Sequence, residues 1–267
     1  MKQGKQKFLT VGAVKRRRFL IVFIISAIAL SLAVWFSVFC RVKLVTVENN
    51  EKVSDTVILT SLGLRPYRHI YSISASKLEK EVMSLSTYVK GVSVKRKLPS
   101  EIVITLDEYK ADYYIVKDEK YYLVSDTLFI LEEIAAEEAE TCGAAPLDLP
   151  DIKEDNKYYT FGVGKTVRFA DSENDTYIKD LMKTIAESPL GSRITALSLD
   201  EKANITAEIE GKYLLKLGNA KEIKRKLDLC HADIEYLSEN MTGVKGTLHA
   251  WNAESITFEI TGVAENP

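Results

Sequence analysis

The seven residues Phe161 to Val167, FGVGKTV, contain the Gly-Lys-Thr triplet that closes a nucleotide-binding P-loop. In such a loop backbone N–H groups wrap the phosphates, and a glycine five positions before the second one allows that wrapping. Tyr159 holds this position here. Thr166 to Ala170 also has the pattern of an extended segment, where a P-loop needs a helix. The stretch therefore predicts a turn and no nucleotide site.

Other residue types that carry catalysis are scattered. The three histidines, His69, His231 and His249, have no neighbouring motif Ser, Cys or acid that would pair a nucleophile with its base. Beyond the long apolar segment, Cys142 and Cys230 form no CxxC or Cys/His cluster, so no zinc site is predicted. We expect no catalytic residue, no metal and no cofactor, and hence a function in binding.

Residues 19–40 read FLIVFIISAIALSLAVWFSVFC and carry no charge. As a helix rising about 1.5 Å per residue, they cover a hydrocarbon core of about 30 Å. A cleaved signal peptide is the alternative, but its apolar region usually spans about 7 to 15 residues and ends at a small-x-small site. Bulky Trp35, Phe36 and Phe39 stand at that point here. The segment therefore predicts one uncleaved transmembrane helix.

Charge predicts the orientation of this helix. Residues 1–18 hold seven Lys or Arg and no acid, so the positive-inside rule keeps this basic tail in the cytoplasm and makes the chain a single-pass type II protein. Because the whole chain is −2 and this tail is +7, the residues after Cys40 sum to −9. An acidic outer part argues against a nucleic-acid partner. The tail either lies against anionic lipid or serves only as a topology signal.

One stripe of the predicted membrane helix consists of small residues. Their spacing places them on one helical face, where small side chains let another membrane helix approach closely. A plain lipid anchor is the alternative. The residues that would pack against a partner helix are Ser26, Ala29, Ala33 and Ser37.

Residues 41–110 predict a compact α+β module. Arg41 to Val47 alternates as a strand that leaves the membrane at once. Ser54 then begins a short helix, and Gly63 ends it. A second helix begins with Ser76 and Glu79 as a capping box. Both helices would cover one face of a small sheet.

The most informative stretch is GVSVKRKLPSEIVITLDEY, at residues 91–109. Its apolar residues alternate on either side of Leu98-Pro99-Ser100-Glu101, as two antiparallel strands joined by a tight turn. With the strand that precedes it, this hairpin resembles the POTRA module of the FtsQ/DivIB cell-division family. The residues that carry the resemblance are Asn50, Val94, Arg96, Leu98, Pro99, Ile102, Ile104 and Glu108.

Residues 111–262 predict a β-rich domain with flanking helices, followed by a short tail at 263–267. Val163 to Lys165, Leu217 to Asn219 and Lys226-Leu227 are similar to the family's β-domain. Residues 132–156, rich in Ala and Glu, look like a surface insertion. We expect strands at 113–116, 120–131, 194–199, 205–209, 213–217, 246–251 and 255–260, and helices at 175–188 and 220–240.

The last of these strands is the candidate binding site. An edge strand with unpaired backbone groups can accept a strand from a partner. By position, the resemblance gives the docking of a FtsB/DivIC-type partner to Ser255, Ile256, Thr257, Phe258 and Glu259. A core strand with Ile256, Phe258 and Ile260 facing inward is compatible with this role.

The resemblance implies a non-enzymatic scaffold of the bacterial divisome at the division septum. It would bind DivIC/FtsB-type and FtsL-type membrane proteins and help to control septal peptidoglycan synthesis. Two other classes remain open. A membrane-anchored cell-envelope enzyme would need a catalytic constellation, and a POTRA-bearing transport factor should carry repeated POTRA units before a membrane barrel.

Overall fold

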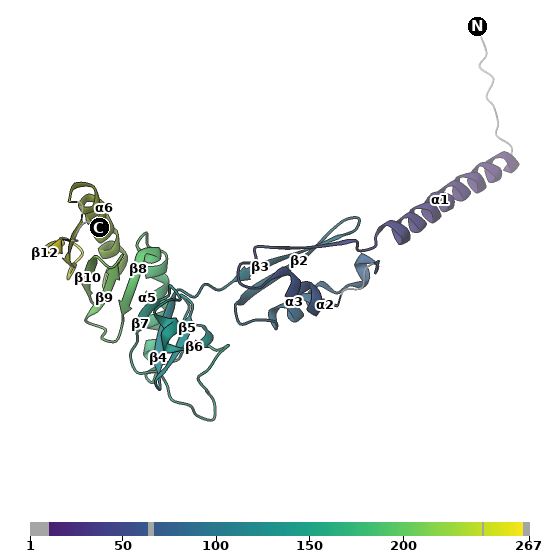
Figure 1. Cartoon of the computed structure of the whole chain (residues 1–267). Helices are drawn as coiled ribbons and strands as arrows, with labels where there is room; N and C mark the ends of the chain where they lie inside the picture. The colour runs from purple at the N-terminus through teal and green to yellow at the C-terminus, as the bar shows by residue number, and fades with distance from the viewer. Residues whose placement is uncertain (1–10, 64–66, 242, 264–267) are drawn as a thin grey trace, which may run out of the picture. The chain divides into compact units, whose positions relative to one another are not determined.

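The computed structural model describes residues 11–63, 67–241 and 243–263. The chain divides into two compact units, Met1–Glu108 and Tyr109–Pro267, each with its own hydrophobic core (Figure 1). Helices and strands are mixed in both units, which confirms the predicted α+β class. Residues 1–10 of the predicted basic tail and residues 264–267 of the predicted C-terminal tail lie outside the described ranges.

The first unit begins with the long helix α1, Val11–Phe39. Its part Arg16–Phe39, of 24 residues, is long and apolar enough to cross a membrane, as the run of uncharged residues predicts. The apolar side chains of this part are exposed, among them Phe19, Leu30 and Trp35. A bilayer is the environment in which such a helix is stable.

A three-stranded sheet follows, with strand order β1-β3-β2. Strand β1 (Leu44–Glu48) pairs parallel to β3 (Glu101–Glu108), and β2 (Val89–Lys97) pairs antiparallel to β3. Helices α2 (Asp55–Leu62) and α3 (Ala75–Met83) lie on one side of this sheet (Figure 1). The predicted order of strand, helix, helix, strand, strand and the predicted hairpin are confirmed.

The start of α3 corrects one prediction. The N-cap is Ser74, whose hydroxyl accepts a hydrogen bond from the N–H of Lys77, and Ser76 lies inside the helix. Glu79 closes no capping box, because its carboxylate accepts a hydrogen bond of 3.0 Å from the N–H of Val94 in β2. The contact with β2 therefore uses the carboxylate of Glu79 that a capping box would need. Helix α2 ends as predicted at Gly63, which adopts the left-handed conformation.

The second unit is a nine-stranded sheet with the order β12-β11-β10-β9-β8-β7-β4-β5-β6. Strand β7 runs parallel to β4 and β8, β10 runs parallel to β11, and the other neighbours are antiparallel. The strands are β4 (Tyr113–Lys117), β5 (Lys120–Val124), β6 (Ile130–Ile134), β7 (Ala145–Asp148), β8 (Ile194–Ser198), β9 (Ile205–Ile209), β10 (Tyr213–Gly218), β11 (Val244–His249) and β12 (Thr257–Val263).

The central strand β7 contradicts the prediction of a surface insertion at residues 132–156. Ala145 and Leu147 are buried and pair with β4 and β8, so this segment joins the two halves of the sheet. Only four residues long, β7 has too little sequence for its alternation to show. Its neighbours in the chain, including the short helix α4 (Ala136–Ala139), fit the Ala- and Glu-rich character of the stretch.

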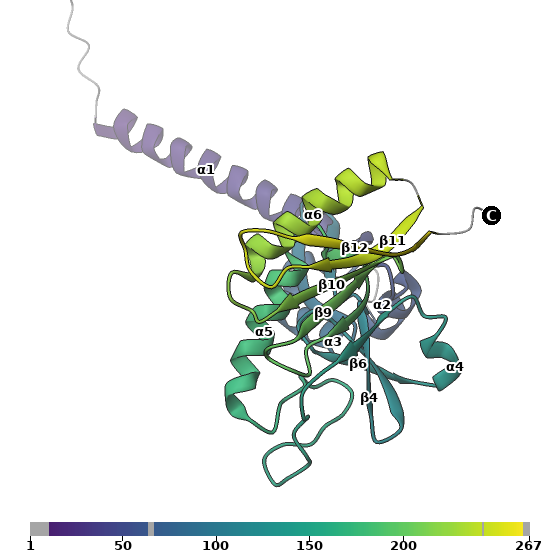
Figure 2. The ribbon, with the colours of Figure 1, turned by 90° about the vertical axis from the view of Figure 1, so that its left-hand side faces the viewer.

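Two helices cover one face of the sheet, α5 (Ser172–Ala186) and α6 (Ile223–Asn240) (Figure 2). Their apolar residues recur at three and four positions and are buried in one core with the inward side chains of the strands. The parallel pair β10 and β11 is joined through α6, because parallel neighbours need a long crossover. This crossover carries the chain to the last hairpin, β11 and β12.

Candidate functional site

Strand β12 forms one edge of the nine-stranded sheet (Figure 2). It pairs antiparallel to β11, from His249 opposite Thr257 to Val244 opposite Val263. Within the described ranges no strand pairs with its other side. Every second residue of an edge strand points its N–H and C=O groups away from the sheet, so β12 offers backbone hydrogen bonds to a partner.

The opposite edge of the sheet, β6, is partly covered by another segment of the chain. The N–H of Ile130 donates to the carbonyl of Lys165 at 2.8 Å, and the N–H of Gly164 donates back to Ile130 at 2.8 Å. Phe129 and Thr166 form a bridge beside them. Gly164 lies in a turn and Thr166 forms the bridge to Phe129, so this stretch covers part of the sheet edge with the turn that its sequence predicts.

The candidate residues of the last strand lie at and before its start. Thr257, Phe258 and Glu259 belong to β12, whereas Ser255 and Ile256 precede it. Thr257 and Glu259 are exposed, and Phe258 is half-buried with its ring centroid 6.4 Å from that of Tyr213. The site therefore combines an exposed face with one aromatic anchor to the core.

Ile260 is not buried in the core as predicted, since 54% of it is exposed. Its register partner is Gly246 in β11, which has no side chain to cover it, and the ring of Phe258 leans over that glycine. Ile256 and Phe258 do pack against the core, as expected.

One polar pair links the two last strands. His249 Nε2 and Glu259 Oε2 are 3.2 Å apart, joining β11 to β12. The imidazole of His249 also stacks on Trp251, with centroids 6.0 Å apart, and Trp251 is 57% exposed. An exposed aromatic ring beside an open strand edge is typical of a recognition surface.

A buried lysine, Lys226, holds the turn at the end of β10. Lys226 in α6 is 2% exposed, and its Nζ donates to the carbonyls of Leu217 at 2.8 Å and Asn219 at 2.9 Å. Burial lowers the pKa of Lys226, because the charged form loses its hydration. The two segments singled out in the sequence, 217–219 and 226–227, therefore meet. Between the two carbonyls lies Gly218, against which the ring of Trp251 packs.

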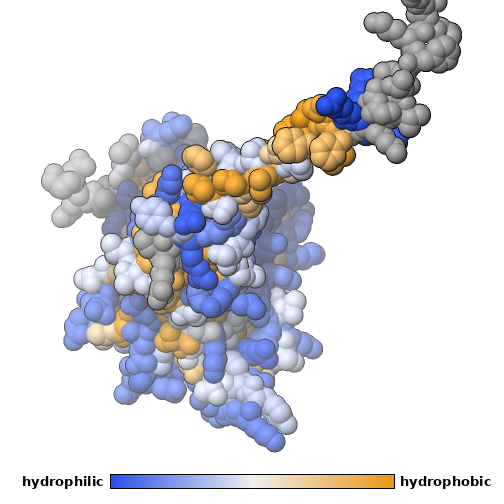
Figure 3. All heavy atoms as spheres, turned by 90° about the vertical axis from the view of Figure 1, so that its right-hand side faces the viewer, coloured by the Kyte–Doolittle hydropathy of each residue, from blue (hydrophilic) through white to orange (hydrophobic). Residues whose placement is uncertain are grey.

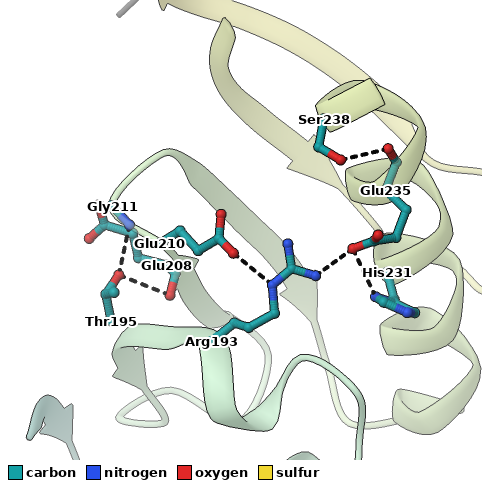
Figure 4. Close-up of polar contacts among 8 residues, drawn as sticks. All are labelled: Arg193, Thr195, Glu208, Glu210, Gly211, His231, Glu235 and Ser238. Carbon is teal, nitrogen blue, oxygen red and sulfur yellow. Dashed lines mark hydrogen bonds and ion pairs between the residues drawn. The ribbon is translucent and has the colours of Figure 1, made fainter. Parts of the chain in front are cut away.

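A second polar contact fixes α6 to the sheet (Figure 4). The guanidinium of Arg193 donates to Glu210 at 2.8 Å, at the turn between β9 and β10, and to Glu235 of α6 at 2.6 Å. Burial works against the charge of Arg193, but its hydrogen bonds to Glu235 and Glu210 outweigh this and raise its pKa. His231 Nδ1 lies 3.8 Å from the same carboxylate oxygen of Glu235.

In the first unit, one carboxylate organises the turn after β1. Glu108 Oε2 accepts hydrogen bonds from the N–H groups of Glu51 at 3.0 Å and Lys52 at 2.7 Å, and Oε1 accepts one from Val53 at 3.2 Å. Asn50 donates to the carbonyl of Val53 at 3.0 Å. The end of β3 is thereby tied to the turn that leads into α2.

Comparison with known proteins agrees with this architecture. The POTRA domain of the FtsQ type matches residues 40–109. The cell division protein DivIB of Clostridium tetani is 25% identical over 190 residues, which are 71% of this chain and 68% of that protein. DivIB of Bacillus subtilis is 30% identical over 101 residues, 37% of this chain and 38% of that protein. The chain therefore carries an FtsQ-type POTRA domain and is similar to cell-division proteins of the DivIB type.

The residues by which the FtsQ/DivIB family is recognised hold the POTRA domain together. Ile102 and Ile104 are buried in its core, and the guanidinium of Arg96 donates to the carbonyls of Ile70 and Ile73, at 3.2 and 2.7 Å. Leu98 is the exception, since 55% of it is exposed beside Pro99 in the turn. Several residues of the motif therefore stabilise the POTRA fold.

The small residues of the predicted membrane helix all lie in α1. Ser26 donates to the carbonyl of Phe23 within the helix, and Ser37 offers its carbonyl to Arg41. Their helical positions keep Ser26, Ala29, Ala33 and Ser37 in a stripe, so packing against another membrane helix stays a prediction.

Sequence reasoning missed the packing role of Gly246, the hydrogen bonds of Lys226 and Arg193, and the pair of His249 with Glu259. A glycine inside a strand pattern signals a close approach of another group, and Gly246 could have been found in this way. The other contacts join residues far apart in the chain and leave no local pattern.

Proposed function

We propose that this chain is a non-enzymatic, bitopic scaffold of the bacterial divisome. It would bind DivIC/FtsB-type and FtsL-type membrane proteins and help to control septal peptidoglycan synthesis. The observation that carries the proposal is the open edge of β12, beside exposed Trp251, in a chain similar to cell division proteins. Antiparallel or parallel addition of a partner strand there would extend the sheet.

The mechanism is tethering. An anchor in the membrane, with the basic tail in the cytoplasm and both folded units outside, confines the chain and its membrane-bound partners to one plane. Effective concentration then raises the joint occupancy of several modest interfaces without any new contact. The partner strand at β12 and, through Ser26, Ala29, Ala33 and Ser37, a partner membrane helix would be two such interfaces.

Proline substitution on β12 tests strand addition, because proline removes one backbone donor. N–H groups of successive residues point to opposite sides, so Thr257→Pro and Ile260→Pro sample both sides of the strand. We expect the variant that keeps the wild-type melting temperature to lose capture of the FtsB/DivIC-type partner from membranes. Thr257→Ala and Ile260→Ala, which keep the donor, are the controls. Wild-type capture by both folded proline variants would end the docking proposal.

The competing class is a membrane-anchored cell-envelope enzyme. Purified full-length chain incubated with peptidoglycan distinguishes the two, since an enzyme would release soluble fragments or form new cross-links at a rate proportional to protein concentration. We expect peptidoglycan to remain unchanged.

A further inference from the structure

The end of the first unit that adjoins α1 is joined to it by backbone hydrogen bonds. The N–H of Cys40 donates to Phe36 in the last turn of α1, at 3.1 Å. The N–H of Ile70 donates to the carbonyl of Cys40, and that of Val42 donates to Arg68, each at 2.8 Å. The loop at residues 67–71 is therefore bound to the first residues after the membrane helix.

The turn of the β2–β3 hairpin lies at the same end. The N–H groups of Lys43 and Leu44 both donate to the carbonyl of Ser100, at 2.8 and 3.3 Å. Residues 98–100 thus stand beside the start of β1, which only four residues separate from the end of α1. We call residues 41–44, 67–71 and 97–100 the membrane-proximal end.

Aromatic rings fix this end to the helix. The ring of Phe36 lies 5.0 Å from that of His69 and 5.4 Å from that of Tyr71, between centroids. The guanidinium of Arg96 lies 5.6 Å from the centroid of the Tyr71 ring. With these contacts and the hydrogen bonds, the membrane-proximal end follows the helix instead of swinging on a linker.

The length of the helix places this end at the bilayer surface. Arg16–Phe39 has 24 residues, which extend about 36 Å and so cross a hydrocarbon core of about 30 Å with little to spare. The headgroup layer outside that core is only about 5–7 Å deep. Residues held within one or two hydrogen bonds of Cys40 must therefore lie in or against the headgroups.

The membrane-proximal end is positively charged, whereas the residues after Cys40 as a whole are negatively charged. Residues 41–44, 67–71 and 97–100 contain four Lys or Arg and no acid, in a chain whose residues after Cys40 sum to −9. The neighbouring Glu101 pairs with Lys97 at 3.2 Å, and the side chain of Lys97 is still 71% exposed. Viewed from the side of α1, hydrophobic and strongly hydrophilic residues gather together at the base of the helix (Figure 3).

Large apolar and aromatic side chains are exposed between these charges. Tyr67 is 65% exposed, Leu44 is 56% exposed and Leu98 is 55% exposed. In water this exposure is unfavourable, but at the boundary of headgroups and acyl chains an apolar body with a polar or charged neighbour is stable. Basic and aromatic residues together are the chemistry that binds an anionic lipid surface.

We propose that the membrane-proximal end binds anionic phospholipid headgroups. Lys43, Arg68 and Lys97 contact the lipid phosphates, while Tyr67 and Leu98 enter the acyl boundary. This contact fixes the POTRA domain against the bilayer, and it does not depend on the division partners proposed above.

Hydrogen exchange of the full-length chain in nanodiscs tests the proposal. Discs of phosphatidylcholine alone are compared with discs that also contain phosphatidylglycerol. We expect amides of residues 67–71 and 97–100 to exchange roughly threefold to tenfold more slowly in the anionic discs, and 0.5 M salt to remove the difference. The triple variant Lys43→Gln, Arg68→Gln, Lys97→Gln should lose it. The matched variant Lys179→Gln, Lys224→Gln, Arg225→Gln, with the same charge change on the second unit, should keep it.

A photo-crosslinking measurement covers the case in which the triple variant does not fold. Benzoylphenylalanine in place of Leu98 should cross-link to lipid in anionic discs, whereas the same group in place of exposed Glu48, at the other end of β1, should not. Equal exchange in both kinds of disc, or equal lipid cross-linking from both positions, would overturn the proposal. Cross-linking of position 98 to a protein in cell membranes, with none to lipid, would likewise overturn it in favour of a protein partner.

Discussion

Phe258 lies directly over Gly246, so that a Cβ atom added to the glycine would stand 2.4 Å from Cε2 of the ring and 2.4 Å from the carbonyl oxygen of Glu259. Both contacts belong to β12, and real Cβ atoms essentially never come so close. The glycine therefore sets the distance at which the edge strand packs on β11. The position of β12 therefore depends on the absence of a side chain at Gly246.

Gly246→Ala should loosen β12 without changing any residue of the strand. Overpacking of this kind costs about 1–3 kcal/mol of unfolding free energy, and hydrogen exchange of residues 257–263 should become faster. Urea unfolding and exchange of the full-length chain in detergent measure both effects. Gly262→Ala is the control, because an added Cβ meets nothing within 4 Å there. Equal effects of the two substitutions would show that Gly246 does not position the strand.

Lys226→Met should destabilise the second unit by about 1–3 kcal/mol, because the carbonyls of Leu217 and Asn219 would lose their buried donor. Methionine keeps most of the apolar stem, so the loss reports mainly on the hydrogen bonds. Lys224→Met, at an exposed position of the same helix, should change stability by less than about 0.5 kcal/mol. Urea unfolding followed by circular dichroism gives both values. A Lys226→Met chain as stable as the wild type would mean that water or backbone movement satisfies the two carbonyls.

Periodicity and turn chemistry predicted much of the fold. The β2–β3 hairpin alternates over both strands around a Pro-containing turn, and α6 repeats its apolar residues every three or four positions, so each pattern is long enough to read. Strand β7 has four residues and is specified by its parallel neighbours, β4 and β8. Ser76 and Glu79 fit the pattern of a capping box, but the carboxylate of Glu79 accepts from Val94 in β2, and the helix is capped by Ser74 instead.

The candidate site was only partly predictable for a related reason. The sequence predicts a strand at residues 255–260 and, through the family resemblance, its role as a docking edge. It does not show what holds that edge in place. The supporting contacts are the hydrogen bonds of Lys226 with the carbonyl of Leu217 and of Arg193 with Glu235, each of which joins two different elements. Such pairs become visible only when the fold brings them together. Ile260 was placed wrongly because alternation alone cannot show that Phe258 fills the space over Gly246.

Alkaline pH should destabilise the second unit. Burial raises the pKa of the Cys230 thiol from 9.0 to about 12 and that of Tyr113 from 10.0 to about 12. The neutral forms are favoured in the folded state, so their contribution is complete below the ordinary pKa values and is lost as pH rises toward 12. One pKa unit corresponds to about 1.4 kcal/mol.

Cys230→Ala distinguishes the pH-dependent contribution of the Cys230 thiol from that of Tyr113. Between pH 8.5 and 10.5 the wild type should lose about 1–2 kcal/mol more unfolding free energy than the variant, since Tyr113 is common to both. Urea unfolding at several pH values measures the difference. Parallel pH profiles would show that Cys230 gains access to solvent before it ionises. In the same samples exposed Cys142 should react with iodoacetamide at pH 8, and Cys230 should not.

Arg193→Lys should weaken the attachment of α6 to the β9–β10 turn, because one ammonium cannot reproduce the two directed contacts of the guanidinium with Glu210 and Glu235. We expect a loss of about 0.5–1.5 kcal/mol of unfolding free energy, reduced in 1 M salt.

Glu108→Gln should destabilise the POTRA domain by about 1–2 kcal/mol. The carboxylate accepts hydrogen bonds from three backbone N–H groups, those of Glu51, Lys52 and Val53. The side-chain amide of glutamine has one acceptor oxygen and no charge, so it cannot replace the carboxylate in these contacts. Hydrogen exchange of residues 51–53 should accelerate, while exchange in the second unit should not change, because it has its own core. Asp107→Asn, at the adjacent exposed position, is the control. If both variants exchange alike at residues 51–53, the turn is held by Asn50 and local chain geometry, and the carboxylate is dispensable.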